Sequence, residues 1–175
     1  DSQMMTSIGI EELSRGDAGI GVTFAVDAIA TKGLVLYGNE EQKQKYLPGI
    51  ADGKLMTAFA ITEPGAGSDA ASLKTKAVKK GDKYVINGVK QFITNGEFAD
   101  ITMVIAVTDP EKKHKGFSAF IVEKDTPGFS PGKREDKMGI RSSVTNELIF
   151  EDCEVPAENI VGEPGQGFYI ATGLL

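Results

Sequence analysis

The middle of the chain, from about residue 55 to residue 155, alternates short apolar runs with pairs of turn-forming residues. The runs are typical of β-strands and fall at 56–62, 84–87, 91–94, 101–107, 117–122 and 147–150. The pairs between them favour turns: Gly81-Asp82, Asn87-Gly88, Asn95-Gly96, Asp109-Pro110 and Pro127-Gly128. Because no helical stretch separates the runs, the pattern predicts an antiparallel β sandwich or barrel-like domain rather than a parallel sheet.

Residues 1–55 have the pattern of helices instead. The stretch 19–36 is apolar nearly all round, so it should form a helix buried on most sides. Asn39 and Gln42 have the spacing of a capping box for a second helix. Glu41 and Lys45 stand in the favourable i,i+4 order on that helix, and Pro48 is expected to stop it.

These patterns predict an α+β chain in three parts: the end of a helical domain at 1–55, a β domain at 56–158, and a linker with the start of a second helical domain at 159–175. The chain begins at Asp1. The last apolar stretch of the chain has no helix stop signal. We therefore expect the chain to be a fragment of a longer protein.

Charge and composition exclude several classes of protein. Nineteen basic residues against twenty-five acidic ones give a net charge of −6, which argues against nucleic acid as a partner. No apolar run approaches the roughly 18 to 20 residues of a membrane span, and no signal peptide is visible. The single Cys153 cannot form an internal disulfide, which fits a reducing compartment, the bacterial cytoplasm or the mitochondrial matrix, rather than secretion.

The segment 62–69, Thr-Glu-Pro-Gly-Ala-Gly-Ser-Asp, follows an apolar strand; we call it the glycine-rich loop. Gly65 and Gly67 allow a ligand to approach the backbone closely. Exposed N–H groups and the Thr62 and Ser68 hydroxyls suit an anion or a polar ring edge. The spacing Gly-x-Gly-x-x-Ala also matches a dinucleotide fingerprint, which we reject because no βαβ unit surrounds it. A connection without any ligand remains the alternative.

Proton-transfer groups are few along the chain. Phe92 and Thr94 end a strand where a flat ligand could lie, although Phe92 also fits a core position. His114 belongs to an exposed basic turn (112–115), and Cys153 has no histidine partner. Glu63 suits an orienting role in the loop better than that of a general base. One histidine and one cysteine cannot form a His/Cys metal site.

Five motifs stand out by their order and spacing. They are Gly38-Asn-Glu-Glu-Gln-Lys-Gln-Lys-Tyr-Leu47, Ala58-Phe-Ala-Ile-Thr-Glu-Pro-Gly-Ala-Gly-Ser-Asp69, Tyr84-Val-Ile-Asn-Gly-Val-Lys-Gln-Phe-Ile-Thr-Asn-Gly96, Lys137-Met-Gly-Ile-Arg141 and Phe150-Glu-Asp-Cys-Glu-Val-Pro156. Together they resemble the acyl-CoA dehydrogenase family, and the late stretch 116–168 looks closest to the short-chain or butyryl-CoA type. The resemblance runs from about Glu11 to the end.

The resemblance implies a subunit with an N-terminal helical domain, a middle β domain and a C-terminal four-helix bundle. It implies an enzyme that binds FAD, desaturates an acyl-CoA thioester between its α and β carbons, and passes electrons to an electron-transferring flavoprotein. A homotetramer is the expected assembly. The family's catalytic glutamate comes from the bundle, after this chain ends, so we expect the parent protein to be active and the fragment inactive.

The resemblance also implies where FAD is held. Phe59, Ile61 and Thr62 would lie along the flavin, with Thr62 hydrogen-bonded to its pyrimidine edge. Gly67 and Ser68 would bind the pyrophosphate. Hydroxyl groups suit this task, because hydrogen bonds to the flavin ring raise its electron affinity.

At the end of the next strand motif, Phe92, Ile93 and Thr94 would flank the isoalloxazine, with the Thr94 hydroxyl near N5. The family often has Trp where this chain has Phe92.

For the substrate, the resemblance implies that Ser68 approaches the pantetheine arm and that His114 and Lys115 lie near the CoA 3′-phosphate. Ala25 and Ile29 fall where the family's buried helix lines the acyl pocket. Two other interpretations stay open: a β module that binds or supports without catalysis, and a related flavin oxidase or monooxygenase.

Overall fold

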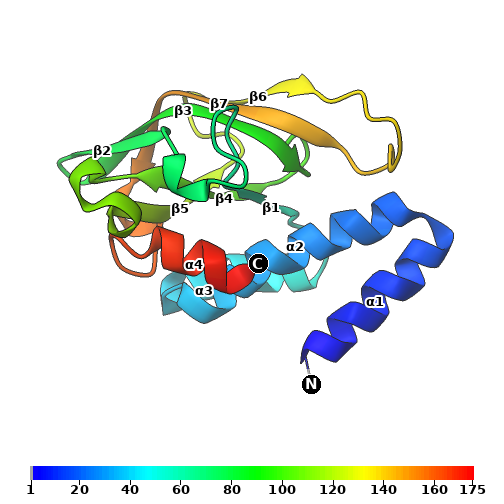
Figure 1. Ribbon diagram of the computed structural model, residues 1–175. Coiled ribbons are helices and arrows are strands. Elements are labelled where there is room, and N and C mark those ends of the chain that lie inside the picture. The colour runs from blue at the N-terminus through cyan, green and yellow to red at the C-terminus, as the bar shows by residue number, and fades with distance from the viewer. Residues whose placement is uncertain (1) are drawn as a thin grey trace.

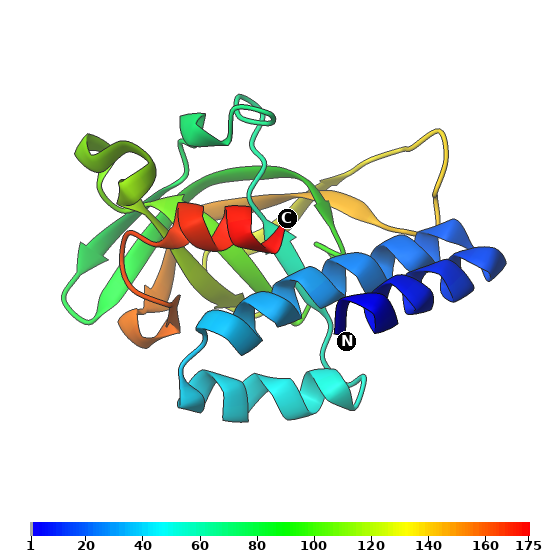
Figure 2. The ribbon, with the colours of Figure 1, turned by 60° about the horizontal axis from the view of Figure 1, so that its bottom comes forward.

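The computed structural model describes residues 2–175 and places helices against one side of a twisted sheet (Figure 1). The helices are α1 (Ser2–Gly16), α2 (Ala18–Tyr37), α3 (Glu40–Ala51) and α4 (Gly167–Leu174). Figure 2 shows α1 and α2 running side by side in opposite directions, with α4 across the sheet near α2. Asp17 begins α2, because its carboxylate accepts hydrogen bonds from the N–H groups of Gly19 and Ile20.

Eight strands form one sheet in the order β6-β7-β3-β2-β4-β5-β8, with β1 paired to β4 beside this path. The strands are β1 (Thr57–Ala60), β2 (Lys76–Lys80), β3 (Lys83–Thr94), β4 (Ile101–Val107), β5 (Phe117–Glu123), β6 (Phe129–Arg134), β7 (Thr145–Pro156) and β8 (Ile160–Val161). Three short 3₁₀ segments connect them: η1 (Ala70–Ser72), η2 (Pro110–Gly116) and η3 (Ala157–Asn159).

The predicted α+β class, with a β domain between helical segments, is confirmed, but the sheet is mixed rather than wholly antiparallel. Strand β1 runs parallel to β4 along its whole length, and β2 meets β4 in parallel at Lys76 and Val107. The remaining pairs of strands are antiparallel. The chain leaves β1 through the glycine-rich loop and returns to β4 only after the β2–β3 hairpin, which allows the parallel pairing.

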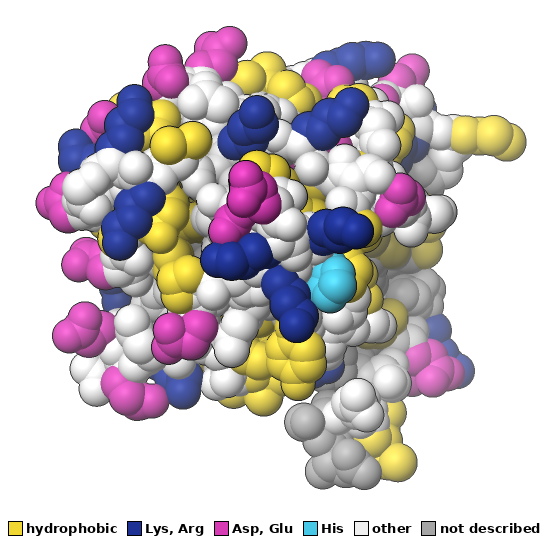
Figure 3. Space-filling view, turned by 60° about the vertical axis from the view of Figure 1, so that its left-hand side comes forward, with side chains coloured by type: hydrophobic (Ala, Val, Ile, Leu, Met, Phe, Trp, Pro, Cys, Tyr) yellow, Lys and Arg dark blue, Asp and Glu magenta, His cyan; other side chains and the backbone are white. Residues whose placement is uncertain are grey.

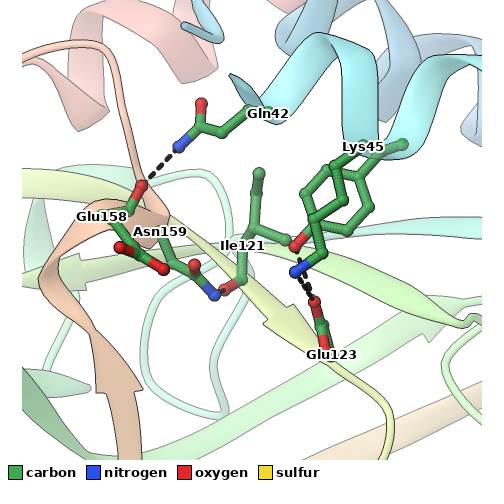
Figure 4. Close-up of polar contacts among 7 residues, drawn as sticks. Gln42, Lys45, Ile121, Glu123, Glu158 and Asn159 are labelled. Carbon is green, nitrogen blue, oxygen red and sulfur yellow. Dashed lines mark hydrogen bonds and ion pairs between the residues drawn. The ribbon is translucent and has the colours of Figure 1, made fainter. Parts of the chain in front are cut away.

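In the helical part, the capping box at Asn39 and Gln42 is confirmed by both of its hydrogen bonds. Pro48, in contrast, does not stop the helix: α3 continues to Ala51 around it. The expected pairing of Glu41 with Lys45 is also replaced. The Lys45 ammonium lies 2.6 Å from Glu123 of β5, and the Tyr46 hydroxyl donates to the same carboxylate at 2.7 Å (Figure 4).

Gln42 adds a second link between α3 and the β domain. Its side-chain amide donates to the carbonyl oxygen of Glu158 at 2.8 Å, while Asn159 donates to the carbonyl of Ile121 (Figure 4). The same amide also donates to the carbonyl oxygen of Ile160 at 2.7 Å. Polar contacts therefore attach α3 firmly to the edge of the sheet.

Two expectations about the strands are wrong. Asn87 and Gly88 do not make a turn but lie inside β3, where the Asn87 side chain pairs with Asp152 of β7. Strand β6 was not predicted, because Pro131 and Gly132 in its sequence are typical of turns rather than of strands. Proline is tolerated there because β6 is an edge strand, paired only with β7.

Buried side chains gather in two clusters. The cluster that includes Phe59 and Met103 also holds residues of α2 and α4, such as Leu34 and Ile170, and therefore lies between the sheet and the helices. The second cluster contains Ile86, Phe120 and other side chains from the strands. Strands β1, β4 and β5 thus contribute alternate side chains to the two clusters.

Helix α2 is less buried than its sequence predicts. Apolar side chains on its outer side, among them Ile20, Phe24, Val35 and Leu36, are between 39% and 54% exposed. By length and composition alone, α2 is also long and apolar enough to cross a membrane, contrary to the expectation that no run approaches that length. Core helices of soluble proteins pass the same test. Here α2 packs against β1, and Asp27, near its middle, accepts the Thr57 N–H at 2.7 Å.

Candidate functional site

The candidate site lies where β1 ends and the glycine-rich loop begins. The N–H of Gln91 in β3 donates to the Thr62 carbonyl at 2.8 Å, so the loop and β3 are joined at this point. Because β1 is parallel to β4, the loop and η2 both follow the same end of the sheet. Residues far apart in sequence therefore share one end of the β domain.

A β-bulge in β3 shapes the site. Lys90 pairs with Leu148 of β7 and Ile93 pairs with Asn146, so β3 holds one extra residue between the two pairs. Phe92 takes a positive φ of 58° in this bulge, which is unusual for an aromatic residue. Its side chain is 58% exposed. The bulge releases the Gln91 N–H for Thr62 and turns an aromatic ring outward.

Beneath the loop, Lys90 and Glu63 form a buried ion pair. The Lys90 Nζ lies 2.8 Å from the Glu63 carboxylate, and the two side chains are 0% and 5% exposed. Burial lowers the pKa of Lys90 to about 8, against the opposing influence of Glu63. For Glu63, burial acts to raise the pKa, but Lys90 and the hydrogen bonds from Thr75 and Lys74 outweigh it and lower the pKa. The orienting role expected of Glu63 agrees with this geometry.

The tip of the loop is open. Gly65, Gly67 and Ser68 are exposed, and a Cβ added to either glycine would meet no atom within 4 Å. In residues 2–175, no hydrogen bond occupies the hydroxyl of Ser68, nor those of Thr62 and Thr94. A polar or anionic ligand would thus meet free hydroxyl groups and accessible backbone.

On the helix side, apolar residues predicted for two different ligands come together. Phe59 is buried, and Ile29 and Ile61 pack half-buried against the same cluster; Ala25 is half-buried one turn earlier on α2. Asn95 connects α2 with β1, since its side-chain amide donates to the Thr23 and Thr57 carbonyl oxygens at 3.2 Å each. Helix α2 is therefore attached to β1 at the strand's first residue, Thr57, and packs along the apolar face that continues to Ile61.

The basic turn is exposed, as expected. His114 and Lys115 belong to η2 between β4 and β5. Figure 3 shows the chain's one histidine at the surface with Lys or Arg side chains around it. The His114 ring lies 5.8 Å from the ring of Phe168 in α4, so the turn contacts the start of that helix.

One residue predicted for the site, Ile93, has other surroundings. Ile93 is 2% exposed and packs in the second cluster, so its side chain serves the core. Cys153, which was not assigned to the site, is buried, and its burial raises the pKa of its thiol to about 11, which disfavours the thiolate form that a nucleophile needs. Within residues 2–175, no group of three or more His, Cys, Asp or Glu residues could hold a metal ion.

Sequence reasoning missed Lys90 and the tertiary contacts of Asn95. The signal for Lys90 was available, because a lysine interrupts apolar positions in a strand close to an acidic loop residue. For Asn95 the expected Asn-Gly turn is present, with a positive φ of 66° at Asn95, but its 2% exposure and its bonds to α2 could not be read from the sequence.

Two known domain families match the chain. Residues 2–54 match the N-terminal domain of acyl-CoA dehydrogenases, and residues 58–153 match their middle domain. A curated acyl-CoA dehydrogenase of Bacillus subtilis is 52% identical over 165 residues, which are 94% of this chain and 44% of the relative.

Solved structures give the same result. The butyryl-CoA dehydrogenase of Megasphaera elsdenii is similar with a TM-score of 0.92 at 47% identity. A chain in a structure of the electron transferring flavoprotein of Acidaminococcus fermentans is similar with a TM-score of 0.92 at 54% identity. In both, the match covers 94% of this chain and 44% of the other. The chain thus spans less than half the length of these relatives.

Proposed function

The chain belongs to the acyl-CoA dehydrogenase family, and from that premise we propose that it forms the FAD- and acyl-CoA-binding core of an α,β-desaturating acyl-CoA dehydrogenase. The observation that carries the proposal is the junction of the glycine-rich loop with the β3 bulge. It joins Thr62, whose hydroxyl is free, to the strand that carries the outward Phe92 ring, and the neighbouring Ile61 packs against the same apolar cluster as Ile29 of α2. Bound FAD would supply a two-electron acceptor that no side chain provides.

The residues present fit such a group in three ways. The hydroxyls of Thr62 and Thr94 are free to bind the polar edge of a flat ring, and Phe92 offers a ring to pack against it. Gly67 and Ser68 are open to a pyrophosphate. Ile61 and Phe59 would support the ring from the helix side.

For the substrate, the same proposal assigns Ala25 and Ile29 to the acyl chain and Ser68 to the pantetheine arm. His114 and Lys115, at the same end of the sheet, would meet the CoA 3′-phosphate, since cationic and N–H donors bind phosphate strongly. The similarity to the butyryl-CoA dehydrogenase supports a short acyl chain.

The proposal places the catalytic base outside residues 2–175. Glu63 is committed to Lys90, and the other carboxylate of the loop, Asp69, accepts the Ser72 hydroxyl. The similarity to a chain found with an electron transferring flavoprotein supports such a protein as the electron acceptor. A homotetramer in the reducing interior of a bacterium or mitochondrion completes the proposal.

The test is the visible spectrum after FAD addition and desalting. It is applied to this chain and to a chimera in which the chain replaces the matching segment of the Bacillus subtilis relative. We expect the chimera to retain flavin with a perturbed absorption band. Thr62→Ala should weaken FAD binding by about tenfold, the factor that corresponds to one lost hydrogen bond, whereas Thr126→Ala, in the turn before β6, should not. A chimera that folds but retains no flavin would contradict the proposal.

The rate at which the reduced flavin reacts with oxygen distinguishes a dehydrogenase from the oxidase and monooxygenase alternative. A dehydrogenase should react slowly with oxygen after reduction by substrate and quickly with an electron-transfer protein. Rapid reoxidation by oxygen in the chimera would favour the alternative. Retention of flavin by the isolated chain, without turnover, would show that this chain forms the binding site by itself.

A further inference from the structure

The ammonium of Lys90 joins β3 to the beginning of the glycine-rich loop at two points. It donates to the carbonyl oxygen of Ile61 at 2.9 Å and to the Glu63 carboxylate at 2.8 Å. These two acceptors stand on either side of Thr62. The position of Thr62, whose hydroxyl is free, is therefore determined by a strand that lies 27 residues or more further along the chain.

Glu63 connects the beginning of the glycine-rich loop to the segment that leads into β2, beyond η1. One of its carboxylate oxygens accepts the Lys74 N–H at 2.7 Å, and the other accepts the Thr75 N–H at 3.0 Å. Its backbone exchanges two hydrogen bonds with Ala66, each of 3.0 Å. The open tip with Gly65 and Gly67 is thus closed at its base around a single carboxylate.

The surrounding backbone is built for this arrangement. A Cβ on Gly88 of β3 would lie 2.8 Å from the Thr75 Cα, so only glycine lets Thr75 come close enough to β3 for Glu63 to reach its N–H. A buried ion pair is often no more stabilising than apolar side chains of similar volume. Stability alone therefore gives no reason for a lysine and a glutamate here, whereas the fixed path of the loop does.

We infer that Lys90 and Glu63 are positioning residues for the FAD site: through the Ile61 carbonyl and the base of the loop they fix Thr62 where its hydroxyl meets the flavin edge. This inference rests on the proposed function. It adds two residues that touch neither cofactor nor substrate and act through Thr62 and the loop.

The first measurement is amide hydrogen exchange on the chain without any ligand. The variant is Glu63→Leu/Lys90→Met, which replaces the ion pair by apolar side chains. Its matched control is Glu154→Leu/Lys83→Met, which removes an exposed pair of similar length, 2.7 Å, between β3 and β7. The informative amides are Gln91 and Ala66, because their acceptors, the carbonyls of Thr62 and Glu63, are retained in both variants.

We expect exchange at Gln91 and Ala66 to accelerate by about tenfold or more in the first variant, the factor for loss of local order worth one hydrogen bond, and to stay unchanged in the control. Unchanged exchange in both variants would overturn the inference, whatever the flavin result. If the first variant does not fold, Glu63→Gln, which keeps the side-chain volume, carries the same measurements.

The second measurement is FAD affinity of the same variants in the chimera. A positioning role predicts binding about tenfold weaker or worse for the first variant, with near-normal stability, and normal binding for the control. Lost amide protection with unchanged FAD affinity would overturn the role. A wild-type chimera that folds without binding FAD would instead overturn the proposed function, and with it the flavin role of the pair, even where the amide result holds.

Discussion

Two ion pairs of similar length, Lys90–Glu63 and Lys45–Glu123, respond to their surroundings in opposite ways. Their N···O distances are 2.8 and 2.6 Å, and each joins segments distant in sequence. The side chains of the first pair are 0% and 5% exposed, those of the second 60% and 44%. Burial lowers the pKa of Lys90 to about 8, whereas the hydrogen bond to Glu123 raises the pKa of Lys45 to about 12.

The difference shows what each pair does for the protein. In water, a charge keeps most of its solvation and a partner adds a modest attraction. Inside the protein, solvation is lost, and the partner and hydrogen bonds compensate for it only when the geometry is right. The exposed pair, Lys45–Glu123, thus adds a modest attraction between α3 and β5. The buried pair, Lys90–Glu63, is stable only when the glycine-rich loop keeps one conformation.

The largest effect is expected from breaking the buried pair on one side only. Lys90→Met leaves the Glu63 carboxylate buried without its cation, which should lower the free energy of unfolding by about 3 to 5 kcal/mol. Urea unfolding of the chain measures this. The double variant Glu63→Leu/Lys90→Met should recover most of the loss, and a single variant as stable as wild type would remove the basis of the comparison.

The pH dependence of stability should have opposite signs for the two lysines. Lys90 has a folded pKa of about 8 against 10.5, so between these values the unfolded chain binds the extra proton and stability rises with pH. Lys45 has a folded pKa of about 12, so its contribution is complete below 10.5 and declines as the pH rises towards 12.

Urea unfolding between about pH 7 and pH 10 tests this. Wild type should gain stability with pH relative to Glu63→Leu/Lys90→Met, while its difference from Lys45→Met should stay constant. A constant difference in both comparisons would mean that burial does not depress the pKa of Lys90 as described.

A smaller effect is expected from removing the Tyr46 hydroxyl, which donates to the carboxylate of the exposed ion pair. Tyr46 is 4% exposed and donates to Glu123 at 2.7 Å. Tyr46→Phe should lower the free energy of unfolding by about 0.5 to 1.5 kcal/mol, the contribution of one hydrogen bond. Thermal unfolding measures it, with Tyr169→Phe, on an exposed ring of α4, as the control. A loss of unfolding free energy as large as that of Lys90→Met would show that the contact between α3 and β5 depends on its geometry as strictly as the buried pair does.

The smallest effect is expected from Lys45 itself. Lys45→Met removes only a half-exposed charge and should cost no more than about 1 kcal/mol. Because salt screens exposed charges, the difference from wild type should shrink when unfolding is repeated in about 1 M NaCl. A difference that persists unchanged in salt would indicate packing of the lysine stem rather than its charge.

Much of the architecture could be predicted from local signals. The capping box at Asn39, the Gly81-Asp82 and Asn95-Gly96 turns and the change from helical to strand periodicity near residue 55 all depend on residues close in sequence. The glycine-rich loop was recognised as a place for a ligand for the same reason. Which residues bind FAD or acyl-CoA stays a prediction until the variants are measured.

Where prediction failed, the deciding contact came from elsewhere in the chain. Gly88 suits a turn by itself, yet β3 continues through it because Thr75 packs against it. Lys45 has the right spacing to pair with Glu41, yet its ammonium binds the carboxylate of Glu123 instead. The Tyr46 hydroxyl donates to the same carboxylate. Phe92 could have been a core residue, and only the bulge opposite Glu147 turns it outward.

The sequence by itself determined the helical character of residues 1–55, the cap at Asn39, the Gly81-Asp82 and Asn95-Gly96 turns, the order of the apolar runs and the family to which they belong, because each depends on neighbours a few residues apart. The tertiary structure alone decided the parallel pairing of β1 with β4, the outward Phe92 and the burial of Lys90 with Glu63. These depend on which groups are removed from water, and that is settled only when strands far apart in sequence pack together.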